Sequence, residues 1–211
     1  MKENAGVGIK TNLLGKGSYM NKSFSLLAIL LSGLSSFALG QQPPQSGHAP
    51  ALTTISEIED RSVRILERDL VQAADAMPES KYSFAPTNGE FKGVRTFALL
   101  VKHVAASNYA MSSAILKEDP PVDLQTENGP VSMTSKTDIM KFLEDSFLYL
   151  HKAARSINEK NATEQVPNPE GAGTVPKLDI ATRQLWHGMD HYGQMVLYLR
   201  MNGIVPPASR H

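Results

Sequence analysis

Four segments of this 211-residue chain carry apolar residues at helical spacing, and this periodicity constrains the fold more than any other feature. They span residues 53–77, 96–116, 137–157 and 178–202, and connections rich in Pro, Gly and Asn separate them. Spacings of three and four place apolar side chains on one helix face, which needs other helices to cover it. No connection shows sustained β alternation. The sequence therefore predicts an all-α four-helix bundle without strands.

Residues at the ends of these segments are typical helix caps. Thr54 and Glu57 have the spacing of a capping box at the start of the first helix. Ser135 and Asp138 form a similar pair before the third helix. Gly203 follows the fourth segment directly, where a glycine commonly ends a helix. The predicted helices therefore have their own start and stop signals.

The segment "MNKSFSLLAILLSGLSSFALGQQ", which begins at Met20, has the parts of a secretory signal. Lys22 is its short basic region, residues 24–34 are apolar, and residues 38–40 form a small-x-small cleavage site. The apolar run is too short to span a bilayer comfortably, which favours a cleaved signal over a membrane anchor. We expect residues 1–40 to be a signal peptide, with translation starting at Met20, and the protein to be periplasmic or extracellular.

Composition limits the partners of the mature chain. Residues 41–52 are polar and Pro-rich and are expected to be a flexible linker before the bundle domain at 53–208. The whole chain has 21 basic and 21 acidic side chains; removal of four lysines and one glutamate with the signal leaves 17 and 20. No basic block could follow a nucleic-acid backbone, so no nucleic-acid partner is expected. The absence of cysteine excludes disulfides, thiolate ligands and a cysteine nucleophile.

The stretch "HGMDHYGQMVLYLR" in the fourth segment contains two histidines four residues apart, His187 and His191. On a helix they project from one face, one turn apart, so both imidazoles can reach one ion. Alone the pair is a weak signal, because two surface histidines have the same spacing. The neighbouring Trp186 favours a face that is not fully solvated. Gly188 and Gly193 are tolerable in a helix where a backbone or a substrate approaches closely.

A metal site needs a third ligand, and His103 is the candidate. It lies in the middle of the second helix among small residues, as a ligand in a bundle interior would. A buried histidine without a partner is costly, and a shared metal would supply one. His151 is the rival, but its position beside Lys152 indicates a partly exposed helix flank. His48 in the linker and His211 at the chain end are not expected to contribute.

Other polar residues near the pair have alternative interpretations. Asp190 could accept a hydrogen bond from an imidazole, although a solvated carboxylate is the commoner case. Gln194 and Tyr198 share the face of the pair and could orient a substrate, or could pack between helices. No Ser-His-Asp order, phosphate-binding loop or repeated Glu-x-x-His motif is present.

Two segments resemble the DinB-like family of damage-inducible four-helix-bundle proteins. They are "HGMDHYGQMVLYLRMNGIVPP" and "MPESKYSFAPTNGEFKGVRTFALLVKHVAASNY", and the resemblance extends over about residues 55–207. It implies a bundle in which His103, His187 and His191 converge on a divalent metal ion, zinc or nickel. It also implies a homodimer. Characterised members include thiol-dependent transferases and isomerases; export distinguishes this chain from those cytoplasmic enzymes and argues against the same thiol substrates.

Three functions remain open at this point. Three imidazoles on a divalent ion leave coordination positions free, which favours a metal-dependent hydrolase or group transferase acting on a small molecule. A fourth protein ligand would instead indicate a non-catalytic metal- or small-molecule-binding bundle of the cell envelope. A purely structural bundle would satisfy its histidines by hydrogen bonds alone. Imidazole suits zinc, nickel, copper and iron alike, so the residues do not select the metal.

Overall fold

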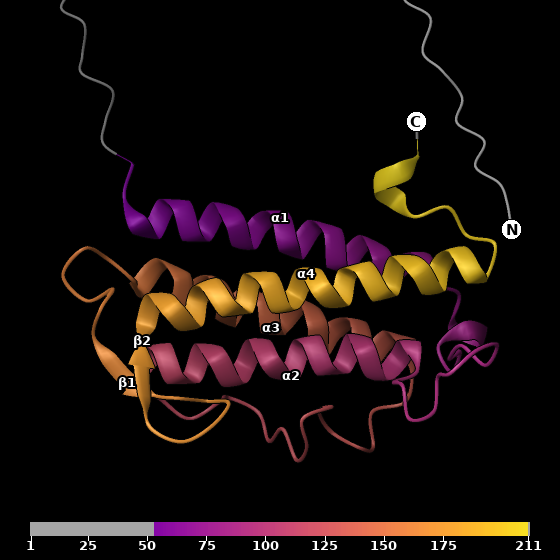
Figure 1. The fold of residues 1–211 in the computed structure, drawn as a ribbon, viewed down its shortest axis with the longest axis horizontal. Helices are drawn as coiled ribbons and strands as arrows, with labels where there is room; N and C mark the ends of the chain where they lie inside the picture. Colours follow the sequence, from indigo (N-terminus) through magenta and orange to yellow (C-terminus); the bar gives the residue numbers. More distant parts are fainter. Residues whose placement is uncertain (1–52, 211) are drawn as a thin grey trace, which may run out of the picture. The chain divides into compact units, whose positions relative to one another are not determined.

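Four long helices make up more than half of residues 53–210, which are the residues that the computed structural model describes (Figure 1). The predicted all-α four-helix bundle is confirmed. Two short 3-10 turns accompany the helices, η1 (Glu79–Lys81) after the first and η2 (Pro207–Ser209) near the end. The helices are α1 (Ile55–Ala76), α2 (Phe97–Leu116), α3 (Lys136–Ser156) and α4 (Lys177–Met201).

The predicted signal peptide at 1–40 and the predicted linker at 41–52 lie outside the described residues. Export therefore stays a prediction. Within residues 53–210, no helix combines the length and the apolar character that a membrane crossing requires.

The helices are arranged so that α1 and α4 run in one direction and α2 and α3 in the other (Figure 1). Helix α2 packs against α3 and α4, and α1 packs against the same two helices. Because α2 and α3 are parallel, the connection between them, residues 117–135, returns along the length of the bundle beside α2. This connection later forms one wall of the candidate site.

The predicted caps are confirmed. The Oγ1 atom of Thr54 accepts a hydrogen bond from the backbone N–H of Glu57, whose carboxylate accepts one from the N–H of Thr54. The Oγ atom of Ser135 accepts from the N–H of Asp138. Gly203 has a φ of 74°, the left-handed conformation that favours glycine after a helix. These contacts satisfy N–H and C=O groups that helix ends leave unpaired.

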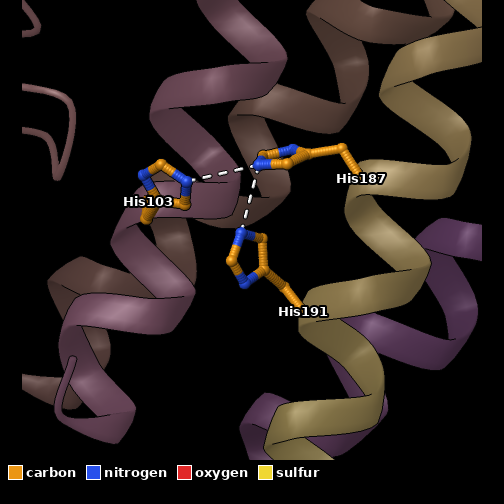
Figure 2. Close-up of side chains that lie close together, drawn as sticks. All are labelled: His103, His187 and His191. Atoms are coloured by element: carbon orange, nitrogen blue, oxygen red, sulfur yellow. Dashed lines mark hydrogen bonds between the residues drawn. The ribbon is translucent and has the colours of Figure 1, made fainter. Parts of the chain in front are cut away.

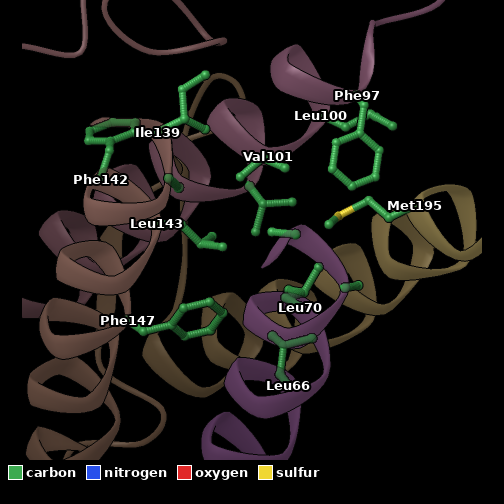
Figure 3. Close-up of a cluster of buried hydrophobic side chains, with 14 of the residues drawn as sticks. Leu66, Leu70, Phe97, Leu100, Val101, Ile139, Phe142, Leu143, Phe147 and Met195 are labelled. Atoms are coloured by element: carbon green, nitrogen blue, oxygen red, sulfur yellow. The ribbon is translucent and has the colours of Figure 1, made fainter. Parts of the chain in front are cut away.

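The core is made of the apolar faces of the four helices (Figure 3). The apolar residues at helical spacing in α2 and α3 are buried from end to end: Phe97, Val101, Val104, Met111, Ile115, Ile139, Leu143, Phe147, Leu150, Ala154 and Ile157. Each large apolar side chain removed from water contributes about 1.5–3 kcal/mol. The largest fully buried ones are Leu66, Leu70, Met77, Phe97, Leu100, Ile115, Ile139, Leu143, Phe147, Ile157, Ile180 and Met195.

A short antiparallel hairpin between α3 and α4 contradicts the prediction of a fold without strands. Strand β1 (Gln165–Pro167) pairs with β2 (Thr174–Pro176), and Val166 lies opposite Val175. Strands of three residues ending in proline are too short to show alternation in the sequence. Val166 is buried in a second apolar cluster together with Ile115 and Ile180, so the hairpin closes one end of the bundle.

The two glycines of α4 have different surroundings. A Cβ atom on Gly188 would lie 2.7 Å from Cδ2 of Leu66, so α1 approaches α4 closely there. A Cβ atom on Gly193 would meet nothing within 4 Å. The described chain therefore approaches closely at Gly188, through a side chain instead of the predicted backbone, and leaves open space at Gly193.

Substitution of these glycines by alanine should separate the two cases. Gly193→Ala should raise the free energy of unfolding by about 1 kcal/mol, because alanine is the better helix former and has room. Gly188→Ala should lose that gain, because overlap with the buried Leu66 side chain costs about 1–3 kcal/mol. Urea unfolding of both variants measures the difference. Equal effects at the two positions would contradict the close approach of α1 to α4.

Candidate metal centre

Three histidines from two helices meet inside the bundle (Figure 2). His103 comes from α2, and His187 and His191 come from successive turns of α4. The Nε2 atom of His187 lies 3.3 Å from Nε2 of His103 and 3.1 Å from Nε2 of His191. His191 is buried and the other two are half-buried. The structure therefore brings together the three histidines predicted to share a metal.

The distances between the nitrogens fit a shared divalent ion. Zinc–nitrogen bonds are about 2.0–2.1 Å, so two ligands of a tetrahedral site lie about 3.3–3.4 Å apart. Octahedral sites with similar bond lengths have edges of about 3 Å. The observed separations of 3.1 and 3.3 Å lie in this range. The three ligand atoms all lie within 4.8 Å of one another, so they are close enough to share a divalent metal, and their geometry does not choose between zinc and nickel.

The outer nitrogens of two of these imidazoles have oxygen partners. The Nδ1 atom of His103 lies 2.8 Å from the backbone carbonyl of Glu127, which can only accept, so Nδ1 carries the proton. The Nδ1 atom of His191 lies 3.4 Å from Oε1 of Gln194. The Nε2 lone pair of His103 is thereby left for a metal. The Glu127 contact could not be predicted, because it comes from a connection without periodicity.

Burial keeps these imidazoles neutral. Loss of hydration lowers the pKa of all three histidines below the ordinary value, and this is the main cause for each. Repulsion from the neighbouring imidazoles lowers the pKa of His187 and His191 further, for His191 to about 4. A neutral imidazole has the lone pair that coordination needs. Protons therefore compete with a metal at lower pH than they would at ordinary imidazoles.

A cavity of about 860 Å³ opens beside His103 and His187. Small residues of α2 form its floor, the connection between α2 and α3 forms one wall, and the hairpin adds Pro169 and Glu170. This volume is in the range of sites for small molecules. The lining residues are His103, Ala106, Ser107, Ala110, Met111, Pro120, Val122, Asp123, Leu124, Gln125, Thr126, Glu127, Pro169, Glu170 and His187.

Tyr198, Asp190 and Trp186, which the sequence also indicates as candidates, form no hydrogen bond to the three clustered histidines. The hydroxyl of Tyr198 donates to the carbonyl of Arg95 at 3.1 Å, which supports the packing interpretation. Asp190 is exposed and accepts from Gln194 Nε2 at 2.9 Å; no hydrogen bond to an imidazole is observed. Trp186 is 59% exposed, so it does not shield the pair as predicted.

The prediction of a partly exposed His151 is wrong. Its side chain is buried, with Nδ1 2.7 Å from Asp60 Oδ1 and Nε2 3.1 Å from Glu67 Oε2. Both carboxylates come from α1, more than 80 residues earlier in the chain, so the local sequence of α3 contains no sign of them. His151 is not part of the three-histidine cluster, which agrees with its rejection as the third ligand.

The chain is similar to known proteins over most of the bundle. Residues 63–195 match the sequence profile of the DinB superfamily. The crystal structure of a DinB-like protein from Bacillus cereus is similar, with a TM-score of 0.59 and 18% identity over 74% of this chain and 97% of that one.

Weaker similarity extends to crystal structures of the mycothiol-dependent maleylpyruvate isomerase and a mutant of it. Their TM-scores are 0.45 and 0.48, and their identities 20% and 18%, over 64% of this chain and 60% of theirs. No curated protein matches the chain significantly. At these identities the structural similarities concern the fold alone.

The ion pair of Asp60 should make the free energy of unfolding depend on pH in acidic solution. Burial raises the pKa of Asp60, but hydrogen bonds from His151 and Arg155 outweigh it and hold the pKa below the ordinary value. A carboxyl of this kind contributes stability above its unfolded pKa and loses it as pH falls through the lower folded pKa. Asp60→Asn should therefore cost about 2 kcal/mol at pH 7. Urea unfolding should show this difference shrinking below about pH 4; a constant difference into stronger acid would contradict the ion pair.

Substitution of the clustered histidines should abolish tight metal binding. His103→Ala, His187→Ala and His191→Ala should each weaken divalent metal affinity at least about 100-fold, since outer partners of ligands alone are worth 10–100-fold. Saturating metal should raise the melting temperature of the untagged parent protein and not of these variants.

His151→Ala is the matched control for that experiment, because it removes a buried histidine outside the cluster. It should lower stability and leave the metal affinity unchanged. Loss of metal binding in His151→Ala with retention in His103→Ala would show that the third ligand is wrong.

Proposed function

This chain belongs to the DinB superfamily, and on that premise we propose that it is a metal-dependent hydrolase or group transferase acting on a small molecule. His103, His187 and His191 would hold the metal, which we propose is zinc or nickel. The proposal includes export to the periplasm or the extracellular space, for which the predicted signal peptide is the support, and a homodimer.

One observation supports an enzyme most strongly: two of the three clustered histidines line a cavity. Among residues 53–210, the cluster that could hold an ion contains these three ligands and no Asp, Glu or fourth His. Catalytic zinc sites have three protein ligands and an open position, whereas structural sites are closed by four. The geometry therefore favours catalysis over a closed binding site, which is the alternative function.

The chemistry of such a site follows from its surroundings. A divalent ion there would act as a Lewis acid towards a water, a thiol or a carbonyl group of a molecule in the cavity. Met111, Val122 and Leu124 provide apolar surface for the body of that molecule. The backbone carbonyl of Glu127 holds His103 in place. The arrangement suits a substrate with an apolar part and one polar group directed at the histidines.

The charges around the cavity disfavour a strongly anionic substrate. Its lining contains the carboxylates of Asp123, Glu127 and Glu170 and no Lys or Arg. The nearby guanidinium groups are already used, since Arg95 pairs with Glu127 and Arg183 pairs with Glu170. A molecule with several negative groups would find no free cationic partner among the lining residues.

Cobalt substitution tests whether the centre is open to the cavity. The visible spectrum of the Co²⁺-loaded protein should change when imidazole, azide or a small thiol is added, because an open position accepts an outside ligand. Ala110→Phe should abolish that change and leave the cobalt content intact, since Ala110 lines the cavity and is not in the metal cluster. A spectrum that no small ligand alters would indicate a closed site and overturn the proposal in favour of the non-catalytic binder.

A further inference from the structure

A continuous series of hydrogen bonds leads from one clustered histidine into the centre of the bundle. The Oγ atom of Ser107 lies 3.3 Å from Nδ1 of His187 and 2.9 Å from Oε1 of Gln184. Beyond Gln184 the series continues across α2 to α3. Its members, which we call the polar chain, are His187, Ser107, Gln184, Asn108, Ser146 and the carbonyl of Leu143.

The inner part of the polar chain is sealed from solvent. Gln184, Asn108 and Ser146 each have no exposed surface. The Nε2 atom of Gln184 donates to Oδ1 of Asn108 at 2.5 Å, and Nδ2 of Asn108 donates to Oγ of Ser146 at 3.0 Å. A buried polar group without a partner costs about 1–3 kcal/mol. The members of the chain therefore have to satisfy one another.

The last acceptor determines the direction of every bond. The carbonyl of Leu143 can only accept, so the hydroxyl of Ser146 donates to it, at 2.6 Å. The Oγ atom of Ser146 is then left to accept from the NH₂ group of Asn108. That orientation turns the carbonyl of Asn108 towards the NH₂ group of Gln184.

The donor and acceptor roles of the remaining bonds, as far as His187, follow in the same way. The carbonyl of Gln184 faces Ser107, whose hydroxyl hydrogen is used in donating to it. The Oγ atom of Ser107 can then only accept from His187, so Nδ1 of His187 carries the proton. Its Nε2 atom, which faces the other two imidazoles, is left with a lone pair.

From this directed series we infer that Ser107, Gln184, Asn108 and Ser146 are positioning residues that hold His187 in the tautomer able to bind a metal. The inference rests on the proposed metal centre and adds residues that would not bind the metal themselves. Ligating histidines are commonly oriented by an oxygen acceptor at the other ring nitrogen. His103 has such an acceptor in a backbone carbonyl. The corresponding partner of His187 is the hydroxyl of Ser107, which can donate as well as accept. The rest of the polar chain is therefore needed to make this hydroxyl an acceptor towards His187.

Reversal of the chain shows why direction matters. If the hydroxyl of Ser107 donated to Nδ1 of His187, the ring proton would move to Nε2 and occupy the atom that faces the cluster. The amide of Gln184 would then have to present its NH₂ group to Ser107, and the carbonyl of Leu143 would lose the hydroxyl of Ser146 as a second donor beside the backbone N–H of its helix. Burial of these groups makes that arrangement costly.

Variants of Ser107 and Gln184 test the inference, and Ser112→Ala is the matched control. Ser112 is also a fully buried serine of α2, but within the described chain its Oγ atom has no hydrogen-bond partner. Ser107→Ala and Gln184→Met should each lower zinc affinity about 10–100-fold. Ser112→Ala should leave it unchanged, and Ser107→Thr, which keeps the hydroxyl, should restore most of it.

Nitrogen NMR of the metal-free protein reports which ring nitrogen of His187 carries the proton. This tautomer should not change in the variants if the substituted residues are purely structural. His187 should be protonated at Nδ1 in the parent protein and in Ser112→Ala, and at Nε2 in Gln184→Met, where Ser107 is free to donate to it. Parent-level zinc affinity with an unchanged tautomer in both Ser107→Ala and Gln184→Met would overturn the inference. A parent protein that binds no zinc but keeps the Nδ1 proton would overturn the proposed function and leave the polar chain standing.

Discussion

The Nε2 atoms of three imidazoles lie close together at the centre of this bundle. With each ring proton on Nδ1, as the surrounding hydrogen bonds favour, separations of 3.1 and 3.3 Å bring the Nε2 lone pairs into mutual repulsion unless a cation lies among them. The remainder of the bundle maintains this arrangement. Helix α1 packs closely on α4 at Gly188, between the two clustered histidines of that helix, and α2 brings His103 to the same point. The apolar core thus holds three imidazoles in an arrangement that is unfavourable without a cation. A divalent metal among them would make this arrangement favourable.

The two sides of the cluster have different roles. Towards α3, the polar chain ties His187 to Ser146 and to the backbone of Leu143 through fully buried groups. Towards the connection between α2 and α3, the same histidine and His103 line an open cavity. A rigid, dry support on one side and an accessible space on the other are what a catalytic metal needs. The Nε2 atoms that would hold the ion lie where the two sides meet.

Much of this could be predicted from the sequence, because the relevant signals are local. Helix periodicity, the capping box at Thr54 and the four-residue spacing of His187 and His191 all depend on residues within two turns of one another. His103 was selected by its position among small residues, and the structure places it in the cluster. The features that escaped prediction are contacts between distant segments or strands too short to show a pattern. The carboxylates that bury His151, the amides of the polar chain and the hairpin at β1 and β2 belong to these classes.

Anomalous diffraction from crystals of the untagged protein, recorded at the zinc and nickel absorption edges, tests the central claim most directly. The account predicts one ion about 2.0–2.2 Å from the Nε2 atoms of His103, His187 and His191, with a remaining position that faces the cavity. An anomalous peak elsewhere would contradict it. So would an empty cluster in crystals grown with excess metal, or a fourth protein ligand that closes the site.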